Sequence, residues 1–227
     1  MARAHEALGG RWTLLIVREI LCGSRRFSDI RRGIPRVSRT VLSERLQALV
    51  HIGAIARSDG PHGPEYTLTA AGQELATLVS ALATWGQRWL ARAPAQEGLD
   101  LEPVLVDMRR RVRFAALPKD PFVVRFEIRG HDQHFLLLKK SEASLCHQNP
   151  GFPEPVCVRG PLAALVAWWR GDVSFIAAKR MGLAIDGPKA FTRAFPKWFE
   201  LYPFAHIVPV ARKTGQDSVP HGHRRAA

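Results

Sequence analysis

Side chains that can pair with bases and phosphates are concentrated between residues 36 and 47. They are Arg36, Ser38, Arg39, Thr40, Ser43, Arg45 and Gln47. The planar fork of arginine matches guanine edges and phosphates, while hydroxyl and amide groups can donate to base edges or accept from them. This chemistry is noncovalent recognition, which needs no nucleophile and no metal. A helix that presents these groups outward would suit the major groove of DNA.

A helix over residues 38–53 is predicted to position these groups. Ser38 is a favourable N-cap, because its hydroxyl can accept an N–H of the first turn. Apolar residues recur at intervals of three or four and define a buried face: Leu42, Leu46, Leu49 and Val50. A shorter helix over residues 27–32 precedes it, with a break at Gly33 and Pro35. Taken alone, the pattern also fits an ordinary amphipathic surface helix.

A hairpin is predicted to follow this helix. Short strands over residues 54–57 and 65–68 flank the pair Asp59-Gly60, and glycine accepts the positive φ that tight hairpin turns need. The side chains expected beside or on its tip, within reach of the minor groove or the phosphates, are Arg57 and His62. The order helix, turn, helix, hairpin predicts a winged helix-turn-helix. A glycine-containing hairpin also occurs in many other small domains.

The charge of the chain favours a polyanionic partner. Its 33 lysines and arginines against 20 acidic residues give a formal net charge of +13. Residues 24–62 hold eight arginines, no lysine and three acidic residues. Double-stranded DNA is the expected partner. The second half of the chain is basic as well, so charge supports this interpretation without deciding it.

The rest of the composition predicts a cytoplasmic protein without a membrane partner. No apolar run reaches about 18 residues, the length that a membrane-spanning helix needs, and no signal-peptide layout is visible at the start. Cys22, Cys146 and Cys157 lack metal-ligand spacing and are expected to be reduced. No metal and no cofactor is predicted.

A long amphipathic helix over residues 70–91 is predicted to hold a homodimer together. Its apolar positions are Leu75, Leu78, Val79, Leu82, Trp85 and Trp89. So small a domain leaves little for such a helix to pack against, and a second copy of the chain would cover it. The alternative is that it packs against the second domain of its own chain.

Two domains are expected: residues 1–93, which bind DNA and dimerise, and residues 99–211. A linker at residues 94–98 joins them, and a basic, loose tail follows over residues 212–227. The second domain should begin with a helix over residues 99–116, whose basic run at residues 109–113 is expected on a solvated face. Short strands are predicted at residues 122–129, 134–138, 143–147, 156–159 and 183–185. Helices are predicted at residues 161–169, 174–180 and 189–199.

Residues 8–90 resemble the HxlR family of bacterial winged-helix regulators. The similarity is carried by residues 8–20 (LGGRWTLLIVREI), 26–32 (RFSDIRR), 41–49 (VLSERLQAL), 65–72 (EYTLTAAG) and 85–90 (WGQRWL). The resemblance implies transcription regulation by a homodimer on a two-fold operator, with the helix after Ser38 as the recognition helix. Many members of the family carry a redox-sensing cysteine before the first helix, and this chain has none there.

Residues 121–200 resemble the sterol-carrier-protein-like fold. This similarity is carried by residues 158–171 (VRGPLAALVAWWRG), 183–188 (LAIDGP) and 195–199 (FPKWF). It implies a small sheet and helices around a tunnel for an apolar or amphipathic effector, lined by Phe126, Leu136, Leu138, Leu165, Trp168, Trp169, Phe175, Phe195, Trp198 and Phe199. The same aromatic residues could instead fill a hydrophobic core.

The predicted fold class is therefore α+β: an N-terminal winged helix-turn-helix with a long dimerisation helix, then a small mixed α/β sterol-carrier-like domain. The predicted function is a DNA-binding transcriptional regulator modulated by a small molecule. The alternative is a carrier for a lipid-like molecule that uses its winged domain for protein contacts. An enzyme is not expected, because no nucleophile-elbow motif, Gly-rich phosphate loop or metal cluster is visible. His206, His221 and His223 are interpreted as parts of the tail region rather than as metal ligands.

Overall fold

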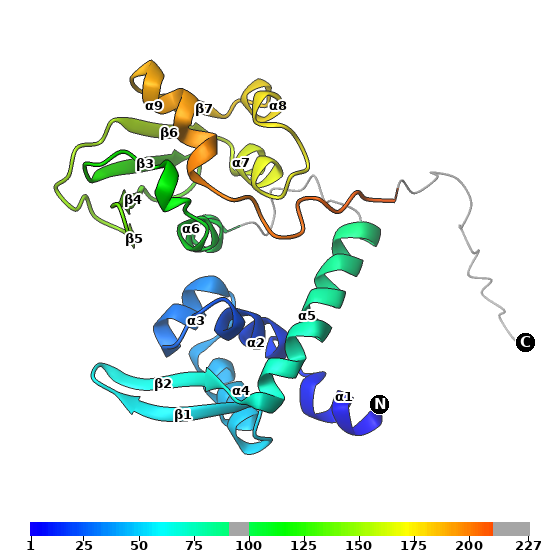
Figure 1. Ribbon diagram of the computed structural model, residues 1–227. Coiled ribbons are helices and arrows are strands. Elements are labelled where there is room, and N and C mark those ends of the chain that lie inside the picture. The colour runs from blue at the N-terminus through cyan, green and yellow to red at the C-terminus, as the bar shows by residue number, and fades with distance from the viewer. Residues whose placement is uncertain (91–99, 211–227) are drawn as a thin grey trace, which may run out of the picture.

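The computed structural model describes residues 1–90 and 100–210 of the protein (Figure 1). Two groups of elements surround two separate apolar cores. We refer to residues 1–90 as the N-terminal domain and to residues 100–210 as the C-terminal domain. The linker predicted at residues 94–98 and the tail predicted at residues 212–227, with His221 and His223, lie outside the described residues.

The N-terminal domain has the predicted order of helix, turn, helix and hairpin. Its elements are α1 (Ala2–Leu8), α2 (Thr13–Leu21), α3 (Phe27–Gly33), α4 (Arg39–His51), β1 (Ile55–Gly60), β2 (Gly63–Leu68) and α5 (Ala70–Trp89). The winged helix-turn-helix and its mixed composition of helices and strands are confirmed.

Helix α4 forms where a good N-cap meets an apolar stripe. The Ser38 hydroxyl accepts a hydrogen bond from the Val41 N–H at 3.2 Å, which satisfies one of the free donors of the first turn. Leu42, Leu46 and Leu49 are buried in the core of the N-terminal domain, as predicted. Val50 was expected on the same face, but it is 37% exposed, because it is turned about 100° around the helix from the buried Leu49.

The hairpin of β1 and β2 is the predicted wing, but its turn falls later in the sequence. The last paired residues are Gly60 and Gly63, so Pro61 and His62 form the turn. The prediction placed the turn at Asp59-Gly60. It was wrong by two residues because Gly63, and not Gly60, takes the positive φ of +104°.

Helix α5 begins close against the wing. The Thr69 hydroxyl accepts from the Gly72 N–H at 3.1 Å and caps the helix. A Cβ on Gly72 would lie 1.9 Å from the Ala54 carbonyl oxygen, so only glycine allows this approach. The helix then extends away from the wing, towards the C-terminal domain (Figure 1).

The C-terminal domain is a five-stranded sheet with helices. Its elements are α6 (Leu101–Arg110), η1 (Phe114–Ala116), β3 (Phe122–Ile128), β4 (His134–Leu138), β5 (Ala143–Cys146), β6 (Val156–Gly160), α7 (Leu162–Trp169), α8 (Phe175–Arg180), β7 (Ala184–Asp186), α9 (Lys189–Ala194) and η2 (Phe195–Trp198). The strand order is β5-β4-β3-β6-β7, and only the β3–β6 pair within it is parallel.

One face of this sheet carries the main core of the C-terminal domain. Val124 and Phe126 of β3 pack with Leu165 and Trp168 of α7 in this core. The opposite face has a smaller cluster of Val123, Phe135 and Leu137. The alternation of side chains along the strands explains the two sets.

The helix predicted over residues 99–116 is shorter than expected and is followed by a separate 3-10 turn. It ends at Arg110, because Arg111 leaves the helical conformation. The basic run after it is not uniformly solvated, since the Arg110 side chain is only 14% exposed. The expectation of a solvated face was wrong at this residue, which contacts the N-terminal domain.

None of the helices within residues 1–90 and 100–210 is long and apolar enough to cross a membrane. The same ranges contain no group of three or more His, Cys, Asp or Glu side chains placed to hold a metal ion.

Candidate DNA-binding interface

The outer face of α4 is open to a partner. Four of the predicted recognition residues are exposed there: Arg39, Thr40, Ser43 and Gln47. Sequence reasoning missed Glu44, which is exposed one turn after Thr40 and whose carboxylate could accept from a cytosine amino group. Its position four residues after Thr40 was a usable signal. Helix α4 and the wing lie on the side away from the C-terminal domain (Figure 1), so DNA could approach without displacing that domain.

Two other predicted contact residues, Ser38 and Arg45, also lie against parts of their own domain. The Ser38 side chain is used for the cap of α4 and therefore positions the recognition residues. Arg45 is half-buried beside the turn between α1 and α2, where a Cβ on Gly10 would lie 3.0 Å from Arg45 Cζ. Arg45 is thus directed towards its own domain, because it lies on the flank next to the leucine stripe.

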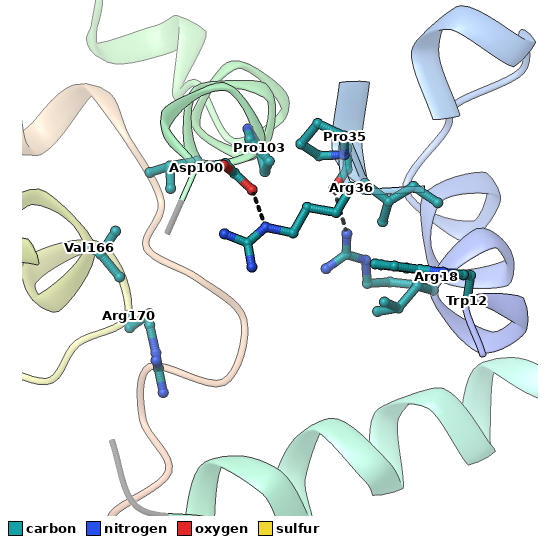
Figure 2. Close-up of a pocket in the computed structure, with 12 residues that line it drawn as sticks. Trp12, Arg18, Pro35, Arg36, Asp100, Pro103, Val166 and Arg170 are labelled. Atoms are coloured by element: carbon teal, nitrogen blue, oxygen red, sulfur yellow. Dashed lines mark hydrogen bonds and ion pairs between the residues drawn. The ribbon is translucent and has the colours of Figure 1, made fainter. Parts of the chain in front are cut away.

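Arg36 is directed towards the C-terminal domain. Its Nε lies 2.9 Å from Asp100 Oδ2, at the start of α6. Figure 2 shows this pair in the space between the two domains. Its partner follows it by 64 residues and could not be seen in a local pattern. Because the Arg36 side chain is 53% exposed, its predicted contact with DNA stays a prediction.

The wing is attached to the rest of the N-terminal domain at its base. The Tyr66 N–H donates to the Arg25 carbonyl at 2.7 Å, and Arg26 Nε lies 3.5 Å from Glu65 Oε1. Arg57, on β1 opposite Tyr66, and His62, in the turn, are both exposed. The geometry leaves both side chains accessible to the DNA backbone.

The predicted dimerisation residues of α5 divide into two sets. Leu75 and Val79 are half-buried against the core of the N-terminal domain. The other four, with 41% to 55% of their surface exposed, are Leu78, Leu82, Trp85 and Trp89. Large apolar side chains left open along one helix mark an interaction surface. We call these four residues the apolar stripe of α5. Within residues 1–90 and 100–210, the C-terminal domain does not cover this stripe.

The residues predicted to line a ligand tunnel come together as a packed cluster. Nine of the ten are buried: Phe126, Leu136, Leu138, Leu165, Trp168, Trp169, Phe195, Trp198 and Phe199. Phe175 is half-buried at the edge. The rings of Trp168 and Phe195 lie 5.6 Å apart, and those of Phe195 and Trp198 lie 5.9 Å apart. Such spacing is typical of aromatic core packing. The geometry favours the second interpretation, a filled core.

The three cysteines bear on redox sensing, which is not expected in this chain. Cys22, Cys146 and Cys157 are free thiols. Burial raises the pKa of the Cys22 thiol, although nearby Arg110 opposes the shift, and burial also raises the pKa of Cys157. A raised pKa leaves less of the reactive thiolate near pH 7.

We therefore expect diamide to leave the DNA affinity unchanged. Fluorescence anisotropy with a duplex selected from a random library by the protein would measure that affinity before and after treatment. Cys22→Ser is the matched control. A loss of affinity in the wild type that is absent from Cys22→Ser would contradict this expectation.

The exposed polar face of α4, the wing and the capped α5 define a winged helix-turn-helix domain of the kind that regulators use. Residues 7–94 match the family model described as HxlR-like helix-turn-helix. The chain belongs to this family.

Several relatives share the N-terminal domain. The HTH-type transcriptional regulator Rv3095 of Mycobacterium tuberculosis is 44% identical over 97 residues, which are 40% of this chain and 60% of the relative. YvaP of Bacillus subtilis, also an HTH-type transcriptional regulator by name, is 40% identical over 91 residues, 39% of this chain and 84% of YvaP. The chain thus spans 60% of the length of the mycobacterial relative. The crystal structure of diamide-treated YodB from B. subtilis is 32% identical, covering 38% of this chain and 88% of YodB, with a TM-score of 0.34.

Proposed function

We propose that the protein is a DNA-binding transcriptional regulator that binds a two-fold operator as a homodimer. The observation that carries the proposal is the outer face of α4, where Arg39, Thr40 and Ser43 are exposed above a buried leucine stripe. Side chains of these types can read base edges in the major groove. Family membership supports the same function.

Dimerisation through α5 would give the operator its symmetry. A two-fold dimer presents two recognition helices about 34 Å apart, which matches half-sites one helical turn apart. The exposed stripe of Leu78, Leu82, Trp85 and Trp89 supports this arrangement. We also propose that a small molecule modulates DNA binding. The other function considered, a carrier for lipid-like molecules, would need a cavity in the aromatic cluster, where the geometry favours a filled core.

Arg39→Ala is expected to weaken binding to the selected operator by about 1–3 kcal/mol, because a bidentate contact to a base edge would be lost. Operator affinity and affinity for an unrelated duplex would be measured by anisotropy over a range of salt concentrations. Arg57→Ala should instead weaken binding to every sequence and lower the salt slope by about one, as expected for a phosphate contact.

Arg180→Ala, on the exposed surface of α8, is the matched control and should change neither quantity. The triple variant Arg39→Ala, Thr40→Ala, Ser43→Ala decides the role of α4. If this variant kept the operator affinity of the wild type, α4 would not be the recognition helix.

A further inference from the structure

Two hollows lie between the N-terminal and C-terminal domains. The larger one has a volume of about 590 Å³ and the smaller one about 290 Å³. Arg18, Gly33, Pro103, Val104, Val166 and Arg170 line both of them. Because they share walls, we treat them as one cleft, which we name the interdomain cleft. A volume of this size is in the range of small-molecule sites.

The walls of the larger hollow combine apolar and charged side chains. Apolar surface comes from Val79 of α5, Leu90 directly after α5, Val104 of α6 and Phe204. The charged lining consists of Arg18, Glu19, Asp107, Arg110, Arg111 and Arg170. Four arginines therefore face two carboxylates. Within the smaller hollow, Figure 2 shows the guanidinium groups of Arg18 and Arg36 directed into the space between the domains.

The two carboxylates of the larger hollow are already engaged. Glu19 is paired with Arg18 and with Arg110. Asp107 accepts from the Trp169 indole N–H at 3.0 Å and lies 3.4 Å from Arg111 Nε. Arg170 is the least tightly paired cation of this wall, because its Nε is 3.8 Å from Asp172 and its side chain is 35% exposed.

Gln87 provides a second observation that points to a ligand. It lies on α5 in the wall of the larger hollow, and only 6% of its surface is exposed. Its amide oxygen accepts a hydrogen bond from Arg170 Nη2 at 3.1 Å. Its amide nitrogen has no hydrogen-bond partner among the described residues. A buried donor without an acceptor costs free energy that a bound acceptor would recover.

We propose that the interdomain cleft binds an amphipathic organic anion, with its carboxylate at Gln87 and Arg170 and its apolar body against Val79, Leu90 and Phe204. A rotation of the Gln87 side chain would uncover its amide nitrogen, from which a carboxylate oxygen can accept, while the guanidinium of Arg170 supplies charge-assisted hydrogen bonds. Among the ten residues of the aromatic cluster, Trp169 alone also lines this cleft.

The ligand would join the two domains at the helix that carries the apolar stripe. Gln87 belongs to α5 and Arg170 directly follows α7, so a molecule held by both favours one arrangement of the domains. A ligand shifts an equilibrium only by its preference for one of two states. Control of DNA affinity by this route rests on the proposed function, whereas ligand binding itself does not.

Isothermal titration calorimetry on the full-length protein without DNA tests the site. The probes are octanoate, octan-1-ol and octyltrimethylammonium, which share the apolar chain and differ in the charge of the head. Octanoate should bind at least about tenfold more tightly than the other two. Gln87→Leu and Arg170→Gln should each weaken octanoate binding about tenfold, the loss typical of a hydrogen bond to a charged group. Arg180→Gln, on exposed α8, is the matched control and should bind like the wild type.

The site is refuted if octanoate binds no more tightly than octan-1-ol, or if neither cleft substitution weakens it. Because Arg170 is partly exposed, its replacement should fold even if Gln87→Leu does not. A parallel anisotropy titration would add octanoate to the DNA complex, and an unchanged DNA affinity of the wild type would overturn the regulatory role. If the protein bound no duplex at all, the proposed function would fail while the calorimetry still decided the ligand site.

Discussion

Replacing Arg110 with alanine is expected to lower the free energy of unfolding by about 3 kcal/mol, since one partner of a buried ion pair is removed. Arg110 Nη2 lies 2.7 Å from Glu19 Oε2 and 2.7 Å from Ser24 Oγ. The Glu19 side chain is 1% exposed, so its carboxylate would stay buried after the substitution. We expect a loss of free energy at the lower end of the range known for broken buried ion pairs, because Arg18 remains beside Glu19.

Urea unfolding followed by tryptophan fluorescence would measure this loss. Arg113→Ala is the matched control, because Arg113 is an exposed arginine three residues further along the same basic run. Its replacement should change the free energy of unfolding by less than about 0.5 kcal/mol. Equal destabilisation by the two substitutions would show that the Arg110–Glu19 pair does not hold the domains together.

The same ion pair connects the C-terminal domain to the segment before α4. Glu19 lies against Gly33, where a Cβ would be 2.0 Å from Glu19 Oε2. Gly33 ends α3, and the short segment from Ile34 to Ser38 leads into α4. Helix α6 and the segment that leads into α4 are thus both in contact with the Glu19 carboxylate.

Local signals in the sequence were sufficient for much of the N-terminal domain. The cap at Ser38, the leucine stripe of α4 and the strand signals of the wing each depend on neighbours a few residues apart. The position of the wing turn was missed because two glycines compete for it, and only the chain path shows that Gly63 takes the positive φ. Local patterns therefore predict which elements form better than where they end.

Contacts between distant segments were beyond such signals. Arg110 meets Glu19 across 91 residues, and Arg36 meets Asp100 across 64. Neither of these partners lies within a few residues of its arginine in the sequence, so nothing local distinguishes the arginine from the other basic residues of the chain. Their partners depend on how the two domains pack, and no periodicity within one helix carries that information.

The aromatic residues of the C-terminal domain illustrate a second limit. Aromatic residues such as Trp168, Phe195 and Trp198 can line an apolar tunnel or fill a core, so the composition does not distinguish the two structures. Their close ring contacts are a property of the packed structure. The interdomain cleft was missed for the opposite reason, because its lining comes from segments far apart in the sequence: α2, α3, α5, α6, α7 and residues 202–204.

Leu82→Arg is expected to convert a homodimer into a monomer and to reduce operator affinity about 100-fold or more. Leu82 is 47% exposed in the middle of the apolar stripe of α5, so the substitution leaves the core of the N-terminal domain intact. In a dimer formed through this stripe, the new guanidinium would be buried against apolar side chains without a partner. A monomer also loses the gain in affinity that comes from binding two linked half-sites, which is commonly about 100-fold to 10,000-fold.

Light scattering at micromolar protein concentration would give the mass, and anisotropy would give the operator affinity. The matched control is Ile176→Arg, which places the same charge at a 66% exposed apolar position on α8, far along the chain from the stripe. It should leave both mass and affinity unchanged. A wild-type protein that scatters as a monomer would refute dimerisation through α5. If Leu82→Arg remained dimeric, the second subunit would have to bind elsewhere, and the exposed stripe would need a different partner.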